Sequence, residues 1–453
     1  MHPLDSVFAH IHEHRDEFLE RLFDYLRQPS ISAYGVGVLD TAAYLMELLS
    51  GIGLDVVQHE TAQWPILEAR YHVGKDVPTV LFYGHYDVQP PDPLDAWVSP
   101  PFDPEIRDGR IYARGVGDNK GQHFANILAI ESLLSCHGGL PCNVILVLEG
   151  EEETGSPHIA KFIREHRSEL VCDLAITSDG PVHESGRACI VFGVRGVATF
   201  ELRAQGANQD LHSGNWGGIA PNPIWTLVHL LGSMKNSNGT VTIPGFYDGI
   251  TAPTPSERAA LDQLPYDVPS IKERLGLGKL DAPTGRGIAD RLALWPTLTI
   301  NGLHGGYAGP GGKTVLPCEA VAKCDIRLVD GQSRDDILGK VAAHVRQHAP
   351  EVEFVRVGGM EPSKTPLESP FTAPLRQAIQ TAQGEDPLLI PALGGTLPDY
   401  VFTQILGVHS FVIPYANSDE SNHAPNENLE VERFFGGIRT GAAILSNLGQ
   451  AQG

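Results

Sequence analysis

The first half of the chain alternates between helical and strand-like patterns of apolar residues. Apolar side chains recur at helical spacing over residues 5–28 and again from Thr41 to Leu49, which predicts two helices. A further helix is expected near residues 121–134. Short apolar runs of strand length surround it, at residues 79–82, 144–148 and 174–177. This alternation of strands with helices predicts an α/β domain with a mainly parallel central sheet.

A different pattern begins after Gly196. Its elements are expected in the order β-α-β-β-α-β, which is typical of a ferredoxin-like α+β module. They are strands at 198–204, 297–300, 320–329 and 352–357, and helices at 223–234 and 334–348. A long stretch rich in Pro, Gly and polar residues, 235–295, interrupts the module after its first helix.

The α/β pattern resumes after a linker at 358–366, with helices at 374–381 and 434–448 and a strand at 411–414. We therefore expect residues 1–196 and 361–453 to form one catalytic-type domain. Residues 197–360 would be a domain inserted into it, acting as a lid or as a dimerisation surface.

Composition narrows the classes of partner and location. The 453 residues carry 33 Lys plus Arg and 55 Asp plus Glu, a formal net charge of −22, which argues against a nucleic-acid partner. The first five residues lack a basic or apolar leader, and no apolar run is long enough to span a membrane. Six cysteines without a Cys-x-x-Cys pair are typical of a reducing cytosol, so a cytoplasmic protein is expected.

The chemistry begins at the end of the strand at 79–82, where Gly84-His85-Tyr86-Asp87-Val88-Gln89-Pro90 follows. Side chains alternate along a strand, so His85 and Asp87 share one face. This arrangement suits a metal-bound imidazole whose tautomer is held by a nearby carboxylate. Taken alone, the same residues could be a strand-end histidine and a solvated aspartate.

Four more segments carry potential ligands, and three of them follow strand-like runs or precede a helix. Each also has a plainer interpretation: Asp118 as a helix N-cap, Glu149–Glu153 as an acidic surface turn, Asp179 as an ordinary turn and His423 as a loop histidine. Together they supply five nitrogen or oxygen ligands, namely His85, Asp118, Glu153, Asp179 and His423. Such a set suffices for two zinc ions, or manganese or cobalt, if one carboxylate bridges them. Two such metals can activate a water for hydrolysis when a neighbouring carboxylate accepts its proton.

These motifs, in this order, resemble the co-catalytic dinuclear-metal peptidase and deacylase family. That family includes carboxypeptidase G, aminoacylase, acetylornithine deacetylase, succinyl-diaminopimelate desuccinylase and carnosinase-type dipeptidases. The resemblance covers roughly residues 10–448. The His85–Pro90 segment, the Trp97–Phe102 run and the long insert are most similar to the carnosinase-type branch. Asn119 departs from it, because the eukaryotic dipeptidases usually carry a second Asp there.

The resemblance implies a role for each motif residue. Asp118 would bridge the metals, with His85 and Asp179 completing one site and Glu153 and His423 the other. Glu152 would be the general base and Asp87 would support His85. The Asp118–Asn119 peptide bond would be cis.

The inserted module resembles the family's substrate-binding and dimer-forming region. His212, in Asp210-Leu211-His212-Ser213-Gly214, would reach the partner subunit's site and polarise the scissile carbonyl of the substrate. The other candidates for substrate binding are Arg327, Thr314, Lys313, Gly395 and Thr396. Arg327 suits a substrate carboxylate because a guanidinium donates two parallel hydrogen bonds. The plainer alternatives are a loop histidine without a role and a surface arginine paired with an acid.

Three functions remain open on this sequence. The leading one is a dinuclear-metal dipeptidase that acts on small peptides as a homodimer. The second is a deacylase of N-acyl amino acids on the same scaffold. A non-catalytic metal-binding protein is disfavoured because all five ligand positions and the Glu152 position are filled.

Overall fold

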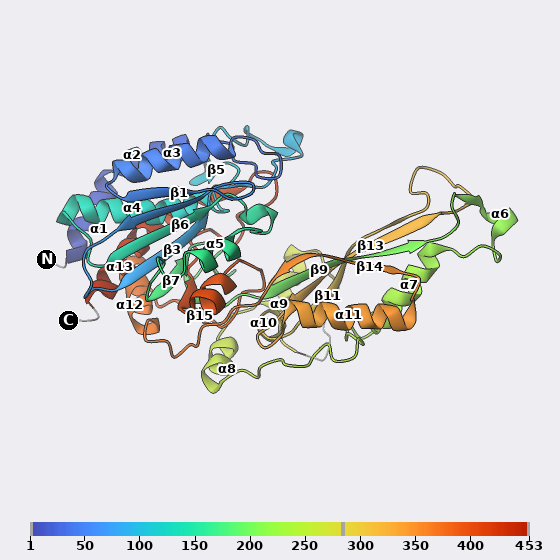
Figure 1. Ribbon diagram of the computed structural model, residues 1–453. Helices are drawn as coiled ribbons and strands as arrows, with labels where there is room; N and C mark the ends of the chain where they lie inside the picture. Colours follow the sequence, from blue (N-terminus) through green and yellow to red (C-terminus); the bar gives the residue numbers. More distant parts are fainter. Residues whose placement is uncertain (1–2, 282–285, 451–453) are drawn as a thin grey trace.

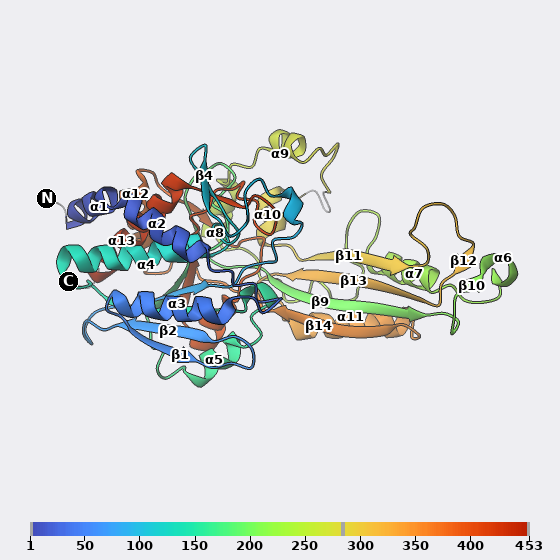
Figure 2. The same ribbon diagram turned by 90° about the horizontal axis from the view of Figure 1, so that it is seen from above.

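The computed structural model describes residues 3–281 and 286–450 (Figure 1). The chain builds two main sheets, and the smaller of these extends away from the larger as an elongated arm (Figures 1 and 2). No helix of the described residues is both long enough and apolar enough to cross a membrane. None of the six cysteines is in a disulfide.

The larger sheet has eight strands in the order β1-β2-β6-β3-β7-β16-β8-β15. The strands are β1 (Asp55–His59), β2 (Ile66–Tyr71), β3 (Thr79–His85), β6 (Asn143–Glu149), β7 (Leu174–Thr177), β8 (Cys189–Val191), β15 (Leu388–Ile390) and β16 (His409–Val412). The four pairs β3·β6, β3·β7, β7·β16 and β8·β15 are parallel. The pairs β1·β2, β2·β6 and β8·β16 are antiparallel. The prediction of a mixed, mainly parallel sheet is confirmed.

Helices cover both faces of this sheet. Side chains alternate along each buried strand, so one strand contacts both helical layers. Val80 and Phe82 of β3 pack with the larger helical layer, whereas Leu81 and Tyr83 pack with α5 (Ile159–Glu165) and the π-helix Val401–Leu406. The larger layer contains α1 (Pro3–Glu13), α2 (Arg15–Leu26), α3 (Val38–Gly51), α4 (Lys120–His137), α12 (Thr372–Gln383) and α13 (Val431–Gln450).

The expectation of one helix over residues 5–28 is wrong in one respect. The helix is interrupted at His14, whose φ of −102° and ψ of 20° leave the helical region, and α1 and α2 form instead. Apolar residues of both helices, such as Ile11 and Leu22, still enter the same core. Because the buried face continues across the break, the apolar pattern contains no sign of it.

The second sheet has four antiparallel strands in the order β11-β13-β9-β14. They are β9 (Gly196–Gln205), β11 (Thr297–Gly305), β13 (Glu319–Leu328) and β14 (Glu353–Met360). The helices α7 (Pro223–Met234) and α11 (Arg334–His348) pack on one face and share its core. This is the ferredoxin-like order expected from the sequence. Two strands extend beyond their expected ends, past β-bulges between Ile300 and Gly302 and between Arg356 and Gly358.

In the long stretch 235–295, the described residues form three short helices that the sequence pattern did not reveal. They are α8 (Pro255–Asp262), α9 (Val268–Arg274) and α10 (Ile288–Ala293). A capping box starts α8, in which Thr254 and Glu257 satisfy each other's backbone N–H groups. Although α8 lies between two elements of the second sheet in sequence, it packs against β15 of the first.

Two small sheets complete the fold. One joins β4 (Glu105–Arg107), β5 (Arg110–Tyr112) and β17 (Asn428–Glu430) near the eight-stranded sheet. The other pairs β10 (Leu211–His212) with β12 (Val315–Leu316) at the tip of the arm, next to α6 (Ser213–Trp216) (Figure 2).

Candidate metal centre

The ends of three neighbouring parallel strands bring the predicted ligands together. His85 ends β3 and is in register with Glu149, which ends β6. Asp179 is the second residue after β7, which is the other parallel neighbour of β3. Ligand sites of α/β folds form at this edge because the carboxyl ends of parallel strands point the same way. Glu153 lies in the turn after β6, and the loops before α4 and β17 supply Asp118 and His423.

The five side chains form two groups that share Asp118. The Nε2 atom of His85 lies 3.2 Å from Asp118 Oδ1 and 3.4 Å from Asp179 Oδ2. The Nε2 atom of His423 lies 3.0 Å from Asp118 Oδ2 and 3.2 Å from Glu153 Oε2. Each oxygen of the Asp118 carboxylate therefore faces a different group. Imidazole and carboxylate donors without a thiolate suit zinc, manganese or cobalt, so the donor set fits a pair of such ions.

Asp87 connects the first histidine to the glutamate turn. Its carboxylate accepts hydrogen bonds from the backbone N–H groups of Glu152 and Glu153, both at 3.1 Å. The Nδ1 atom of His85 lies 3.1 Å from the Asp87 carbonyl oxygen and 3.4 Å from its carboxylate. Such a contact orients the ring so that Nε2 faces the other ligands.

Glu152 differs from the other carboxylates of the acidic turn. Glu149 accepts hydrogen bonds from Tyr83 (2.5 Å) and Ser156 (2.8 Å). Glu151 is held by the Trp64 N–H (3.2 Å) and His158 (2.7 Å), and Glu153 by the side-chain amide of Gln89 (2.9 Å). Among the described residues, none donates a hydrogen bond to the Glu152 carboxylate. The carboxylates of Glu149, Glu151 and Glu153 thus accept hydrogen bonds, whereas that of Glu152 accepts none from the described residues.

Burial raises the pKa values of two of the clustered acids, and hydrogen bonds to the cluster raise the pKa values of the two histidines. Burial, with the negative charge of Asp118, raises the pKa of Glu153 to about 7, and burial raises the pKa of Glu152 well above its usual range. Hydrogen bonds to Asp118 and Glu153 raise the pKa of His423 to about 11. Burial opposes the protonated form of His85, but hydrogen bonds to Asp118, Asp179 and Asp87 outweigh it and raise its pKa.

Sequence reasoning missed the residues that hold the Asp118 loop. The fully buried Glu427 accepts hydrogen bonds from the N–H groups of Gly117 (2.9 Å) and Asp118 (3.0 Å) through one oxygen. Its other oxygen binds the Gly115 N–H (2.9 Å) and the buried guanidinium of Arg114 (2.7 Å). Arg114 lies four residues before Asp118 and Glu427 four residues after His423. Only their deep burial, which the sequence does not report, distinguishes them from other charged residues nearby. The Asp118–Asn119 peptide bond is cis.

The loop that carries His423 has a strained backbone. Ser421, His423 and Asn426 have φ values of 58°, 56° and 62°, in the left-handed region that side chains rarely adopt. The Asn426 side chain fastens the loop to the Trp97–Phe102 run, accepting from the Val98 N–H and donating to the Ala96 carbonyl, each at 2.9 Å. The side chain of His423 remains 54% exposed, so the centre opens to solvent on this side.

A second group of predicted residues lies where the two sheets meet. Arg327, near the end of β13, donates a hydrogen bond to the Thr396 hydroxyl at 2.7 Å. Within the described part of the chain Arg327 has no acidic partner at ion-pair distance, contrary to the plainer interpretation. The Arg195 guanidinium, which sequence reasoning missed, donates twice to the carbonyl of Gly394 (2.7 and 2.9 Å) and holds the loop that contains Gly395 and Thr396.

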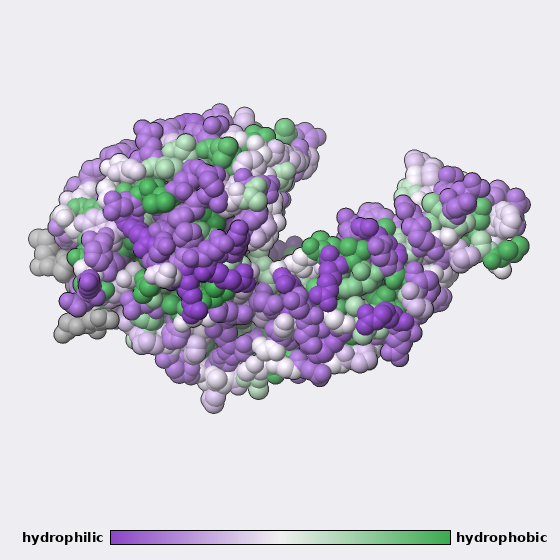
Figure 3. All heavy atoms as spheres, in the orientation of Figure 1, coloured by the Kyte–Doolittle hydropathy of each residue, from purple (hydrophilic) through white to green (hydrophobic). Residues whose placement is uncertain are grey.

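The remaining predicted residues lie at the far tip of the arm. His212 Nε2 is 3.3 Å from the Thr314 hydroxyl, and both residues belong to the β10–β12 region. Lys313 is exposed beside the ring of Tyr307. An open hollow separates the arm from the part built on the eight-stranded sheet (Figure 3). His212, Thr314 and Lys313 are thus not brought to the metal centre of their own chain.

The fold and the candidate metal site define a metallopeptidase. The chain belongs to peptidase family M20/M25/M40, whose family model matches residues 81–447. Peptidases of this family bind metal ions, and the site described above is the candidate position for them.

Curated relatives and solved structures match almost the whole chain. A β-Ala-His dipeptidase of Rattus norvegicus is 28% identical over 470 residues, covering 98% of this chain and 95% of that protein. The Cys-Gly metallodipeptidase of Schizosaccharomyces pombe is 28% identical, covering 96% of each. The crystal structure of an M20 family metallo-carboxypeptidase from Sulfolobus solfataricus has a TM-score of 0.91 and 33% identity, covering 96% of this chain and 99% of that one.

Metal binding should strengthen as the pH rises from 6 to 8. His423, with a pKa of about 11, and Glu153, with a pKa of about 7, carry protons in the metal-free protein at pH 6 and must release them to bind a metal. Each released proton changes the apparent affinity about tenfold per pH unit. Competition with a chromogenic chelator at several pH values measures this dependence. An affinity that stays constant over the range would contradict the protonated state inferred here, and Glu153→Gln should reduce the slope.

Proposed function

We propose that this protein is a dinuclear metallopeptidase that hydrolyses dipeptides. The observation that carries the proposal is the shared Asp118 carboxylate, one oxygen of which faces His85 and Asp179 and the other His423 and Glu153. Two divalent ions per chain would occupy these groups. The nitrogen and oxygen donors favour zinc, and they also suit manganese or cobalt.

Glu152 is the proposed general base. Two bound metals, when present, supply Lewis-acid activation of a water and of the scissile carbonyl. Glu152 then accepts a proton from the attacking water and delivers it to the nitrogen of the departing amino acid. Its carboxylate, to which no described residue donates a hydrogen bond, supports both steps, because a base must accept the proton and later give it back. Asp87 keeps the turn and His85 in place by the contacts described above.

The substrate is proposed to be a dipeptide with a free carboxylate. Arg327 would bind this carboxylate, with Thr396 and Gly395 beside it, and Lys313 and Thr314 would contribute from the arm. The named activities of the rat and yeast relatives support a dipeptide over an N-acyl amino acid. Both kinds of substrate end in a carboxylate, so Arg327 does not distinguish them. N-acyl-amino-acid hydrolysis on the same centre is the second candidate. A reducing cytosol remains the expected location.

A homodimer formed by residues 197–360 would complete the site. The arm exposes apolar side chains on α7 and on the edge strand β11, among them Trp225 (60% exposed), Ile300 (50%) and Leu303 (46%). Unpaired edges and exposed apolar residues of this kind are typical of a surface that a second copy covers. In such a dimer, His212 of one chain would donate a hydrogen bond to the carbonyl oxygen at the other chain's centre. The distance of His212 from its own centre supports this role.

Glu152→Gln should abolish most dipeptide hydrolysis without removing metal. The amide keeps the shape of the side chain but cannot accept the proton, which typically lowers turnover about 10²–10⁴-fold. Turnover should be measured on dipeptides and N-acetyl amino acids with zinc and manganese supplied separately, and metal content by elemental analysis.

Glu153→Gln is the matched control on the next residue, and it should lower metal content instead. Wild-type turnover in Glu152→Gln would refute the proposed base. Faster cleavage of N-acetyl amino acids than of every dipeptide by the wild type would favour the deacylase.

Mixed dimers should test the shared site. Homodimers of His212→Ala and of Glu152→Gln should each be nearly inactive. After equimolar subunit exchange, about a quarter of wild-type activity should return, because half of the dimers are mixed and each has one complete site.

The matched control pairs Glu152→Gln with the double variant Glu152→Gln/His212→Ala, which has no intact Glu152 and should recover nothing. Mass spectrometry should first verify that subunits have exchanged. If no activity then returns, or if a monomer is fully active, a site completed by the partner subunit is ruled out.

A further inference from the structure

The two crossings between the sheets lie side by side and are closely packed. Residues 192–196 lead into β9, and residues 360–366 lead back from β14. The backbone N–H of Ser363 donates to the Val194 carbonyl (3.0 Å), and the Ser363 hydroxyl accepts from the Val194 N–H (3.1 Å). A Cβ at Gly193 would lie 2.3 Å from the Ser363 carbonyl oxygen, so no side chain fits there. The two crossing segments are therefore packed and hydrogen-bonded to each other, unlike a flexible linker.

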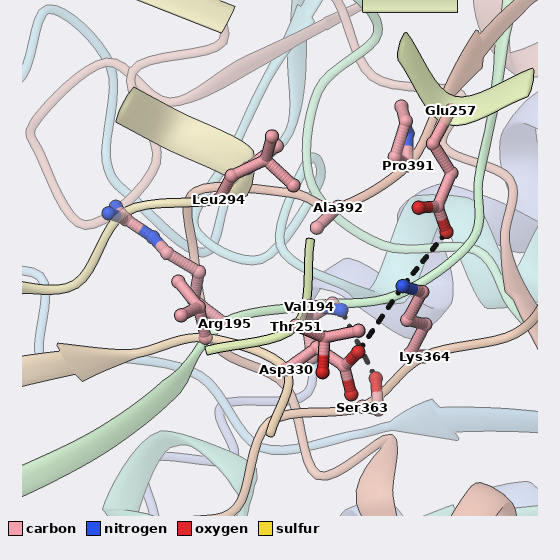
Figure 4. A pocket seen from close by; sticks show the side chains of 12 residues that line it. Val194, Arg195, Thr251, Glu257, Leu294, Asp330, Ser363, Lys364, Pro391 and Ala392 are labelled. Atoms are coloured by element: carbon pink, nitrogen blue, oxygen red, sulfur yellow. Dashed lines mark hydrogen bonds and ion pairs between the residues drawn. The ribbon is translucent and has the colours of Figure 1, made fainter. Parts of the chain in front are cut away.

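Lys364 connects both sides of this junction through two ion pairs (Figure 4). Its Nζ atom lies 2.9 Å from Glu257 on α8 and 3.2 Å from Asp330, two residues beyond β13. Since α8 packs against β15 of the eight-stranded sheet and β13 belongs to the four-stranded sheet, one ammonium group joins the two.

The two acids differ in how firmly they are held. Glu257 is 2% exposed, and its second oxygen accepts from the Thr254 N–H at 2.8 Å within the capping box. A buried carboxylate needs a cationic or hydrogen-bonding partner, and among the described residues Lys364 is the only cation paired with Glu257. Asp330 is 42% exposed at its side chain. Lys364 is therefore anchored on α8, and Asp330 is the more adjustable contact with the arm.

This junction adjoins the contact between Arg327 and Thr396. Asp330 lies three residues after Arg327, and Ala392, four residues before Thr396, lines the same small cavity as Lys364 and Asp330. The crossing segment is also bonded to this loop, since Leu393 N donates to the Gly193 carbonyl (2.8 Å) and Arg195 N donates to the Leu393 carbonyl (3.2 Å). Arg327 comes from the four-stranded sheet and Thr396 from the side of the eight-stranded sheet, so their 2.7 Å contact depends on how the two are placed.

We propose that Lys364 is a positioning residue for substrate binding. By holding Asp330 against α8, it keeps Arg327 aligned with the loop that carries Thr396, and so sets the affinity for the substrate's carboxylate. The inference rests on the proposed function, in which Arg327 receives that carboxylate. Lys364 pairs with Glu257 and Asp330, and it is neither one of the proposed metal ligands nor one of the proposed substrate contacts.

Asp330→Asn tests the proposal because it leaves the pair between Lys364 and Glu257 intact. The KM for a dipeptide should rise about two- to fivefold, the range that a partly exposed ion pair supplies. The kcat should change by less than twofold and metal content should stay the same. The same dipeptide with a C-terminal amide should keep its wild-type KM, because it has no carboxylate to align with Arg327. Lys364→Arg, which can still reach both acids, should keep the wild-type KM.

Hydrogen exchange supplies a readout that needs no turnover. The amides of Arg195 and Leu393 should exchange faster in Asp330→Asn than in the wild type. Asp336→Asn is the matched control, since it removes an exposed ion pair of 2.7 Å to Lys340 on α11, away from the junction; it should change neither exchange nor KM. Unchanged exchange in Asp330→Asn, or equal KM increases for the carboxylate and amide substrates, would overturn the proposal. Failure of the wild type to cleave any dipeptide would instead refute the proposed function, while the exchange result would still stand.

Discussion

The crowding of carboxylates around Asp118 is the constraint on which the rest of the site depends. Asp118, Asp179 and Glu153 meet with Glu152 nearby, and burial raises the pKa of the last three. Like charges at such short range cannot all be ionised without cations among them. In the metal-free protein the protonated rings of His85 and His423 meet part of this need. A pair of divalent ions would meet it fully, and this requirement links the geometry of the site to the metal chemistry proposed for it.

Strand pairing and buried hydrogen bonds hold these carboxylates in place. Parallel pairing of β3 with β6 and β7 brings His85, the glutamate turn and Asp179 to one edge of the sheet. Glu427, paired with Arg114, holds the Asp118 loop, and the Asp87 carboxylate holds the glutamate turn. Glu420 adds a further buried carboxyl close to Gly117, without a hydrogen-bond partner among the described residues. On the side of the His423 loop the centre remains open to solvent.

Much of this arrangement could be predicted from sequence because its signals are local. Each strand next to the centre is a short apolar run, and His85 and Asp179 lie at or just beyond the ends of two such runs. The ferredoxin-like order of the arm also followed from alternating and helical patterns. The break at His14 could not be predicted, because the same apolar face continues through it. Glu257, Asp330 and Lys364 could not be connected either, since an ion pair between distant polar residues leaves no periodic pattern. The assembly depends on a second chain, so the role of His212 stays a prediction.

Metal stoichiometry tests the central claim most directly. The measurement is elemental analysis of folded protein, saturated with zinc or manganese and then dialysed, alongside Asp118→Asn. Two metals per wild-type chain are expected, and Asp118→Asn should lose occupancy at both positions because its carboxylate faces both groups. One metal per chain or none in the saturated, folded wild type would contradict the shared Asp118 site.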